Sequence, residues 1–169
     1  RYPIVHIEAG LRSGRLDQPF PEEGNRKLCS HIATYHFAPT DAAVAHLAKE
    51  GIHDSVWQVG NTVIDALQLG LARVKSASNT FHLPNLPANA PYILLTAHRR
   101  ENFGAPITDI CRAIQDIVKA YPDYHVVYPV HPNPHIHGPV HELLQHPRIH
   151  LIEPVGSPQL IQLMQGCQF

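Results

Sequence analysis

The segment HIEAGLRSGRLDQPFPEEGNR, residues 6–26, contains the end of a short apolar run and the start of an acidic helix. The mostly apolar residues at 4–7 predict a strand. Pro21 and the two glutamates after it predict a helix that runs to about residue 33, because proline suits a first helical turn and carboxylates complement the positive end of the helix dipole. A strand, a turn with glycine and proline, and a helix in this order indicate a parallel α/β sheet.

The alternation of short apolar runs with longer amphipathic stretches continues along the chain. Strands are expected at residues 4–7, 35–38, 56–59, 92–96, 125–129 and 149–152. Helices are expected at 21–33, at 40–50, from 61 onward and at 106–120. The proline- and histidine-rich stretch after the fifth strand is expected to be a turn. The predicted fold class is α/β throughout.

Residues 76–90 differ in composition from their surroundings, because serine, asparagine and proline dominate them. Such a segment is typical of a connector between two sheets. We therefore expect residues 1–75 to belong to one domain and residues 91–169 to another.

Composition narrows the classes of function. The 169 residues are 44% hydrophobic and carry a net charge of −1, which does not fit the strongly basic surface of a nucleic-acid-binding protein. The three cysteines lie far apart, which argues against a disulfide scaffold and favours a reducing cytoplasm. No apolar run approaches the ~18 residues that cross a bilayer, so no membrane association is expected. The chain starts without methionine in an apolar segment, which suggests a piece of a longer protein.

Polar clusters follow three of the expected strands. They are the residues from Glu8 to Gly14, the sequence HRRENFG at 98–104 and the sequence HPNP at 131–134. In an open parallel sheet, ligands bind beyond the carboxyl ends of the strands. The three clusters are therefore candidate parts of a binding site.

The motifs HIEAGLRSG, PEEGNR, GNTVIDAL, HRREN and HPNP together resemble the non-hydrolysing UDP-N-acetylglucosamine 2-epimerases, and they follow that family's order over nearly the whole chain. The resemblance implies two Rossmann-like halves of the GT-B type, with the nucleotide sugar in the cleft between them. Both halves would be incomplete in this chain, and residues 76–90 would be the interdomain crossing.

The resemblance also implies a reaction. Family members are cytoplasmic bacterial enzymes that interconvert UDP-GlcNAc and UDP-ManNAc and so supply ManNAc-type sugars for cell-envelope polysaccharide. UDP leaves C1 as a proton leaves C2, which gives 2-acetamidoglucal, and UDP then adds back. Such a route needs an acid, a base and groups that stabilise the leaving diphosphate. A homodimer is expected, and neither a metal nor another cofactor is.

By resemblance, Glu8 and Glu22 match the two catalytic glutamates of the family and His98 matches its catalytic histidine. Two other interpretations of the glutamates stay open: Glu8 could form a salt bridge with Arg12, and Glu22 could serve only the helix dipole or pair with Arg26. The predicted substrate-binding residues are Arg12, Arg99, Arg100, His131 and Asn133. Of these, one of Arg99 and Arg100 is expected to be structural, Asn133 to orient its loop, and Arg12, like Arg26, to organise the acidic loop.

The histidines of HPNPHIHGPVHELLQH suggest a metal site only weakly. His131, His135, His137, His141 and His146 are close in sequence, but Pro132, Pro134 and Pro139 interrupt the helical spacing that would align ligands. Only His137 and His141 keep that spacing. We expect solvated loop histidines, and an ordinary surface position for His146 and His150.

The chain lacks the first strands of the family pattern, with their nucleotide-binding loop and aspartate, and the later loop that holds uridine and ribose. It is therefore predicted not to turn over substrate alone. Three alternatives stay open: a hydrolysing epimerase that releases UDP and free ManNAc, a GT-B glycosyltransferase, and a non-catalytic nucleotide-sugar-binding fragment.

Overall fold

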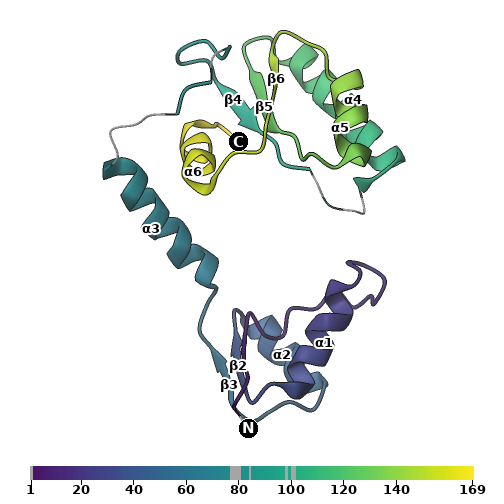
Figure 1. The fold of residues 1–169 in the computed structure, drawn as a ribbon, viewed down its shortest axis with the longest axis vertical. Coiled ribbons are helices and arrows are strands. Elements are labelled where there is room, and N and C mark those ends of the chain that lie inside the picture. The colour runs from purple at the N-terminus through teal and green to yellow at the C-terminus, as the bar shows by residue number, and fades with distance from the viewer. Residues whose placement is uncertain (1, 77–80, 84, 98, 100–101) are drawn as a thin grey trace. The chain divides into compact units, whose positions relative to one another are not determined.

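The structure is a computed structural model that describes residues 2–76, 81–83, 85–97, 99 and 102–169. Strands and helices alternate along the chain (Figure 1). Residues 1–66 and 67–169 form two compact units, called unit 1 and unit 2 below. The expected α/β class is confirmed. The boundaries expected at 75 and 91 stay a prediction, since part of the expected connector lies outside the described residues.

Unit 1 contains a three-stranded parallel sheet in the order β1-β2-β3. The strands are β1 (Val5–Ile7), β2 (Tyr35–Ala38) and β3 (Val56–Gln58), and the helices between them are α1 (Glu22–Ile32) and α2 (Asp41–Lys49). Helix α3 (Thr62–Ser76) follows β3 and leads into unit 2. This arrangement places the chain segments after β1 and after β3 at the same edge of the sheet, because parallel strands end there together.

The core of unit 1 is small. Ala9, Ala38, Ala43 and Leu47 are almost completely buried where α2 packs on the sheet. Thr40 caps α2 by accepting a hydrogen bond from the amide of Ala43, as its position before the helix predicts.

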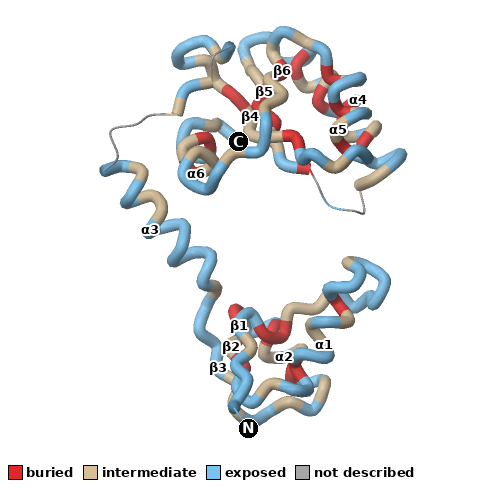
Figure 2. Tube along the Cα trace, in the orientation of Figure 1, coloured by how far each residue is buried: buried red, intermediate tan, exposed pale blue. Residues whose placement is uncertain are grey.

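Unit 2 contains a second parallel sheet in the order β4-β5-β6. Its strands are β4 (Tyr92–Leu94), β5 (His125–Pro129) and β6 (Ile149–Ile152), and its helices are α4 (Ala105–Ala120), α5 (Pro134–Leu143) and α6 (Ser157–Gly166). Buried residues concentrate on β5 and on the helix faces around it (Figure 2).

Strand β5 contributes to two cores because alternate residues of a strand point to opposite faces. Val126 and Tyr128 pack with the buried faces of α4 and α5, whereas Val127 packs with Leu163 of α6. Burial on both faces is typical of a doubly wound α/β sheet and explains the nearly continuous apolar run in this strand.

All six expected strands are present, with shorter ends at β1, β3 and β4. The helices expected at 21–33, 40–50, 61 onward and 106–120 are also confirmed. Among the described residues, no helix is long and apolar enough to span a membrane.

The expectation of a turn after β5 is wrong, because residues 134–143 form helix α5. Asn133 caps this helix by accepting a hydrogen bond from the amide of His135. Pro134 occupies the first turn, where no intrahelical donor is needed. Ile136 and Val140 are completely buried one turn apart, so packing outweighs the donor that Pro139 removes inside the helix.

Candidate functional site

The loop after β1 is held rigidly against the sheet and α2. The amide of Ala9 donates to the carbonyl of Phe37 at 3.0 Å, which continues the pairing of β1 with β2. Gly10 has a φ of +84°, and a Cβ there would overlap the carbonyl of Ala43 on α2. Nδ1 of His46 lies 3.0 Å from the carbonyl oxygen of Gly10, and since that oxygen only accepts, the ring must donate. A glycine is therefore required at position 10.

Glu8 lies at the start of this loop with its side chain exposed. Its φ is +59°, in the left-handed region that non-glycine residues rarely adopt and that is enriched at functional sites. Oε1 of Glu8 accepts a hydrogen bond of 2.6 Å from Nδ2 of Asn61, the residue directly before α3. The alternative interpretation, a salt bridge between Glu8 and Arg12, is not what holds this carboxylate.

Arg12 is part of an internal network. Its Nε and one terminal nitrogen donate to the two carboxylate oxygens of Glu50 at 2.9 and 2.6 Å. The remaining contacts are to the hydroxyl of Ser30 at 2.9 Å and the carbonyl of Leu11 at 2.8 Å. The hydrogen bonds between Arg12 and Glu50 raise the pKa of the arginine and lower that of the glutamate. Arg12 thus organises the loop, and a role in substrate binding stays a prediction.

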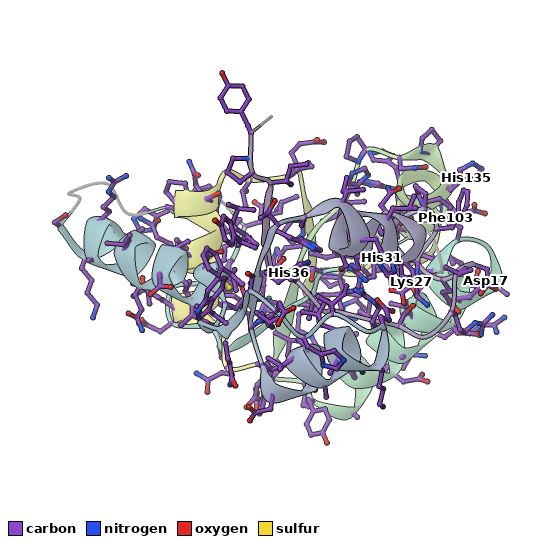
Figure 3. All side chains as sticks on the ribbon, turned by 90° about the horizontal axis from the view of Figure 1, so that it is seen from below. Asp17, Lys27, His31, His36, Phe103 and His135 are labelled. Atoms are coloured by element: carbon purple, nitrogen blue, oxygen red, sulfur yellow. The ribbon has the colours of Figure 1, made fainter. Side chains whose placement is uncertain are left out.

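Helix α1 adds further charge to this network. Lys27 lies 3.7 Å from Glu50. His31, one turn further along α1, also contributes to the lowered pKa of Glu50 (Figure 3). Arg12, Glu50 and Lys27 line a pocket of about 270 Å³ together with Ser13, Gly14, Glu23, His46 and Lys49. Neither Glu8 nor Glu22 is among the lining residues, so this pocket is not formed by the predicted acids.

The two neighbouring glutamates of PEEGNR have different environments. Glu22 is exposed in the first turn of α1, whereas Glu23 is completely buried. Glu23 accepts hydrogen bonds from the amides of Ser13 and Gly14 at 3.1 and 3.2 Å. Burial alone would raise the pKa of Glu23, but these amides, together with the positive charge of Arg12, outweigh it and lower the pKa.

Arg26 of α1 lies 3.6 Å from the Glu23 carboxylate. The structure therefore gives Arg26 a partner in Glu23, one residue later than the Glu22 pairing considered from the sequence. Both residues then belong to the framework that fixes the loop at Ser13 and Gly14, while Glu22 stays accessible.

In unit 2, the predicted residues that the structure describes follow β4 and β5. The amide of Asn133 donates to Nδ1 of His131 at 3.1 Å, and His131 is exposed. The side chain of Asn133 caps α5, and its expected role in orienting the loop stays a prediction. Arg99 is exposed after β4. His98 and Arg100 lie outside the described residues.

The segment that leads to HRREN is anchored from β5. The buried hydroxyl of Tyr128 donates to the carbonyl of Ala97 at 2.7 Å, and burial raises the pKa of this phenol to about 12. After HRREN, Phe103 stacks on His135 of α5 with ring centroids 5.3 Å apart (Figure 3). These two contacts tie Ala97 and Phe103, the residues on either side of HRREN, to β5 and α5, the elements that flank HPNP.

Four other histidines of unit 2 form two pairs. The rings of His137 and His141 have centroids 4.1 Å apart on α5, as their helical spacing predicts. Nδ1 of His125 lies 2.8 Å from Nε2 of His150, so His150 has a specific partner and is not an ordinary surface residue. Within the described part of the chain, no group of three or more histidine, cysteine or acidic side chains could hold a metal ion.

Sequence reasoning missed the roles of Asn61, Glu50 and Glu23. The sequence predicts only a helix start at Asn61, although its position after a strand, at the sheet edge, is a usable signal for a site residue. Nothing in the sequence indicates that Glu50 pairs with Arg12, because the two residues are 38 positions apart. The partners of Glu23 are backbone amides, which no pattern of side chains reveals.

The two parallel sheets, their helices and the polar residues after their strands define an α/β protein with two Rossmann-like units. Residues 1–169 match the family model described as UDP-N-acetylglucosamine 2-epimerase, and the chain belongs to this family. The five motifs thus pointed to the correct family, UDP-N-acetylglucosamine 2-epimerase, while the non-hydrolysing type stays a prediction.

Named relatives and solved structures support the same family assignment. The chain is 45% identical to a UDP-N-acetylglucosamine 2-epimerase of Escherichia coli O157:H7, over 97% of this chain and 46% of the relative. The UDP-GlcNAc 2-epimerase of Neisseria meningitidis, solved with bound UDP-GlcNAc, is 41% identical, with a TM-score of 0.91 over 98% of this chain and 46% of that one. The Methanocaldococcus jannaschii enzyme, solved with UDP-GlcNAc and UDP, is 32% identical, with a TM-score of 0.81 over 99% of this chain and 47% of that one. The chain thus spans about half the length of these relatives.

Proposed function

We propose that this protein catalyses the reversible C2 epimerisation of UDP-GlcNAc to UDP-ManNAc by elimination and re-addition of UDP. The single observation that carries the proposal is the placement of Glu8: an exposed carboxylate on a left-handed backbone position at the carboxyl end of β1, held by Asn61. The relatives solved with UDP-GlcNAc and with UDP support the choice of substrate.

In the proposed reaction, a carboxylate takes the C2 proton while the bond between C1 and the diphosphate oxygen breaks. The electrons of the C2–H bond form the C1–C2 double bond of 2-acetamidoglucal, and the electron pair of the broken bond leaves with UDP. UDP then adds back to C1, and C2 receives a proton from the opposite face. Two acidic groups on different sides of the ring would satisfy this requirement, and we assign them to Glu8 and Glu22.

The leaving diphosphate needs positive charge and hydrogen-bond donors near its oxygens. We assign this task to His98, Arg99, Arg100 and His131, with Asn133 holding the loop of His131. Arg12 supports the site through Glu50. The accompanying proposals are a homodimer in the cytoplasm that serves cell-envelope polysaccharide, and domains at 1–75 and 91–169 joined by 76–90.

The decisive experiment is proton NMR of UDP-GlcNAc in D2O with the complete reading frame that encodes this chain. We expect deuterium at C2 and UDP-ManNAc to appear with the wild type and both to be lost with Glu8→Gln. Glu142→Gln makes the same change at an exposed position of α5 and should leave the activity unchanged.

Other outcomes would contradict the proposal in distinct ways. UDP together with free ManNAc would identify a hydrolysing epimerase. An unchanged spectrum, with UDP-GlcNAc still bound by calorimetry, would identify a non-catalytic nucleotide-sugar-binding protein.

A further inference from the structure

Both polar atoms of the Asn61 side chain have defined partners. Oδ1 accepts a hydrogen bond of 3.0 Å from the amide of Val63, in the manner of a helix N-cap. Nδ2 donates the 2.6 Å hydrogen bond to Oε1 of Glu8. Because an amide N–H can only donate and an ionised carboxylate can only accept, these two partners fix which way the Asn61 amide points.

The backbone of Glu8 is fixed, but its side chain would be free without Asn61. The loop is held by the Ala9 amide and by the close packing of Gly10 on α2. An exposed glutamate has three rotatable side-chain bonds and samples several rotamers, so a fixed backbone alone does not place its carboxylate. A hydrogen bond to an ionised acceptor is short and directional, and it selects one of these arrangements.

We propose that Asn61 is a positioning residue that holds the Glu8 carboxylate in the orientation used for proton transfer at C2. This inference rests on the proposed function. Asn61 engages Oε1 and would leave Oε2 for the substrate, and among the described residues Oε2 has no hydrogen-bond partner. Asn61 thus acts through Glu8 and does not itself touch the reacting atoms.

Such a role has a kinetic signature. Misplacing a reacting group lowers the rate of the chemical step much more than it changes the binding of a substrate held mainly by other contacts. We therefore expect the loss of the Nδ2 donor to appear in kcat, while KM stays nearly constant.

Two substitutions separate the donor from the helix cap. Asn61→Ser and Asn61→Asp both keep an oxygen that can accept from the Val63 amide, and serine and aspartate are favoured N-cap residues. Serine removes the amide donor, and aspartate removes it and also places a negative charge against Glu8. Asn89→Asp adds the same charge at an exposed turn of unit 2 and is the matched control.

The variants are made in the complete reading frame, and the rate of C2 deuterium incorporation into UDP-GlcNAc is measured. We expect kcat to fall roughly 10- to 100-fold in Asn61→Ser and further in Asn61→Asp, with KM within about threefold and a Tm close to that of the wild type. Asn89→Asp should behave as the wild type.

Several results would overturn the inference while the proposed function survives: wild-type kcat in Asn61→Ser, a rise in KM at constant kcat, or a loss of rate that follows a loss of thermal stability. If the wild type itself incorporates no deuterium, the proposed function fails first.

Discussion

Replacing Arg12 by methionine should destabilise unit 1 strongly, because the Arg12 side chain is only 5% exposed and makes four hydrogen bonds. Methionine keeps much of the length but leaves the Glu50 carboxylate, 20% exposed, without its main partner. Breaking a buried ion pair by removing one partner costs ~3–5 kcal/mol. Lys27, at 3.7 Å from Glu50, compensates in part, so we expect the lower end of this range.

A loss of ~3 kcal/mol in a unit of this size lowers Tm by roughly 12 °C or more. Thermal and urea unfolding of the 169-residue chain, followed by circular dichroism, would measure it. Arg15→Met is the matched control, since Arg15 pairs with Asp17 in the same loop but both side chains are more than half exposed; no measurable change is expected there. The double variant Arg12→Met/Glu50→Met should recover part of the loss, because it removes both charges of the buried pair and leaves only Lys27, whose side chain is 42% exposed, without this partner.

Unchanged stability in Arg12→Met would refute this reasoning. If UDP-GlcNAc binding by the complete protein also fell in that variant, Arg12 would be a substrate-binding residue, as its place in the HIEAGLRSG motif suggests, and its network with Glu50 would not matter in solution.

The other predictions concern the loop, the β5 strand and the response to acid. Gly10→Ala should cost at least about 1–2 kcal/mol for the left-handed backbone alone, and more for the overlap with Ala43; a urea midpoint equal to the wild type would contradict the packing described. Tyr128→Phe should cost about 1–2 kcal/mol, because a buried carbonyl loses its donor, and denaturant unfolding would measure the change. Burial lowers the pKa of both His125 and His150 in the folded state. As the pH falls, these histidines therefore bind protons in the unfolded chain before they do so in the folded one. Their contribution to stability is fully present above the unfolded pKa of 6.5 and is lost as the pH falls below that value. Tm measured between about pH 7.5 and 5 should fall less in His150→Gln than in the wild type.

The strands and helices that could be predicted are those whose sequence pattern agrees with the way they pack in the fold. Strand β5 is a nearly continuous apolar run, and it is buried on both faces. Helix α2 begins where Thr40 could cap it, and Thr40 does. Helix α5 is not predictable from composition, because Pro134 and Pro139 are typical helix breakers. The buried pair of Ile136 and Val140 gave the opposite signal, and tertiary packing decided between the two.

The candidate site was predictable in its residue types but not in its partners. The left-handed backbone of Glu8 depends on how residues 9 and 10 pack against the sheet and α2. That packing joins segments more than 25 residues apart in the sequence. The motif therefore predicts which types of side chain the site contains, whereas the contacts that orient these side chains depend on the fold.

The two neighbouring glutamates of α1 cannot be told apart from the sequence, but the fold gives them different environments. Consecutive residues of a helix project about 100° apart, so only one of the pair can face the loop at Ser13 and Gly14. Glu23 does so, and its carboxylate is occupied by two backbone amides and Arg26. A buried carboxylate held in this way is not exposed to a substrate, which supports the proposal that Glu22, the exposed glutamate of this motif, is the one that takes part in chemistry. Glu23 anchors the first turn of α1 to the loop at Ser13 and Gly14, and this contact fixes the position of the backbone that carries Glu22.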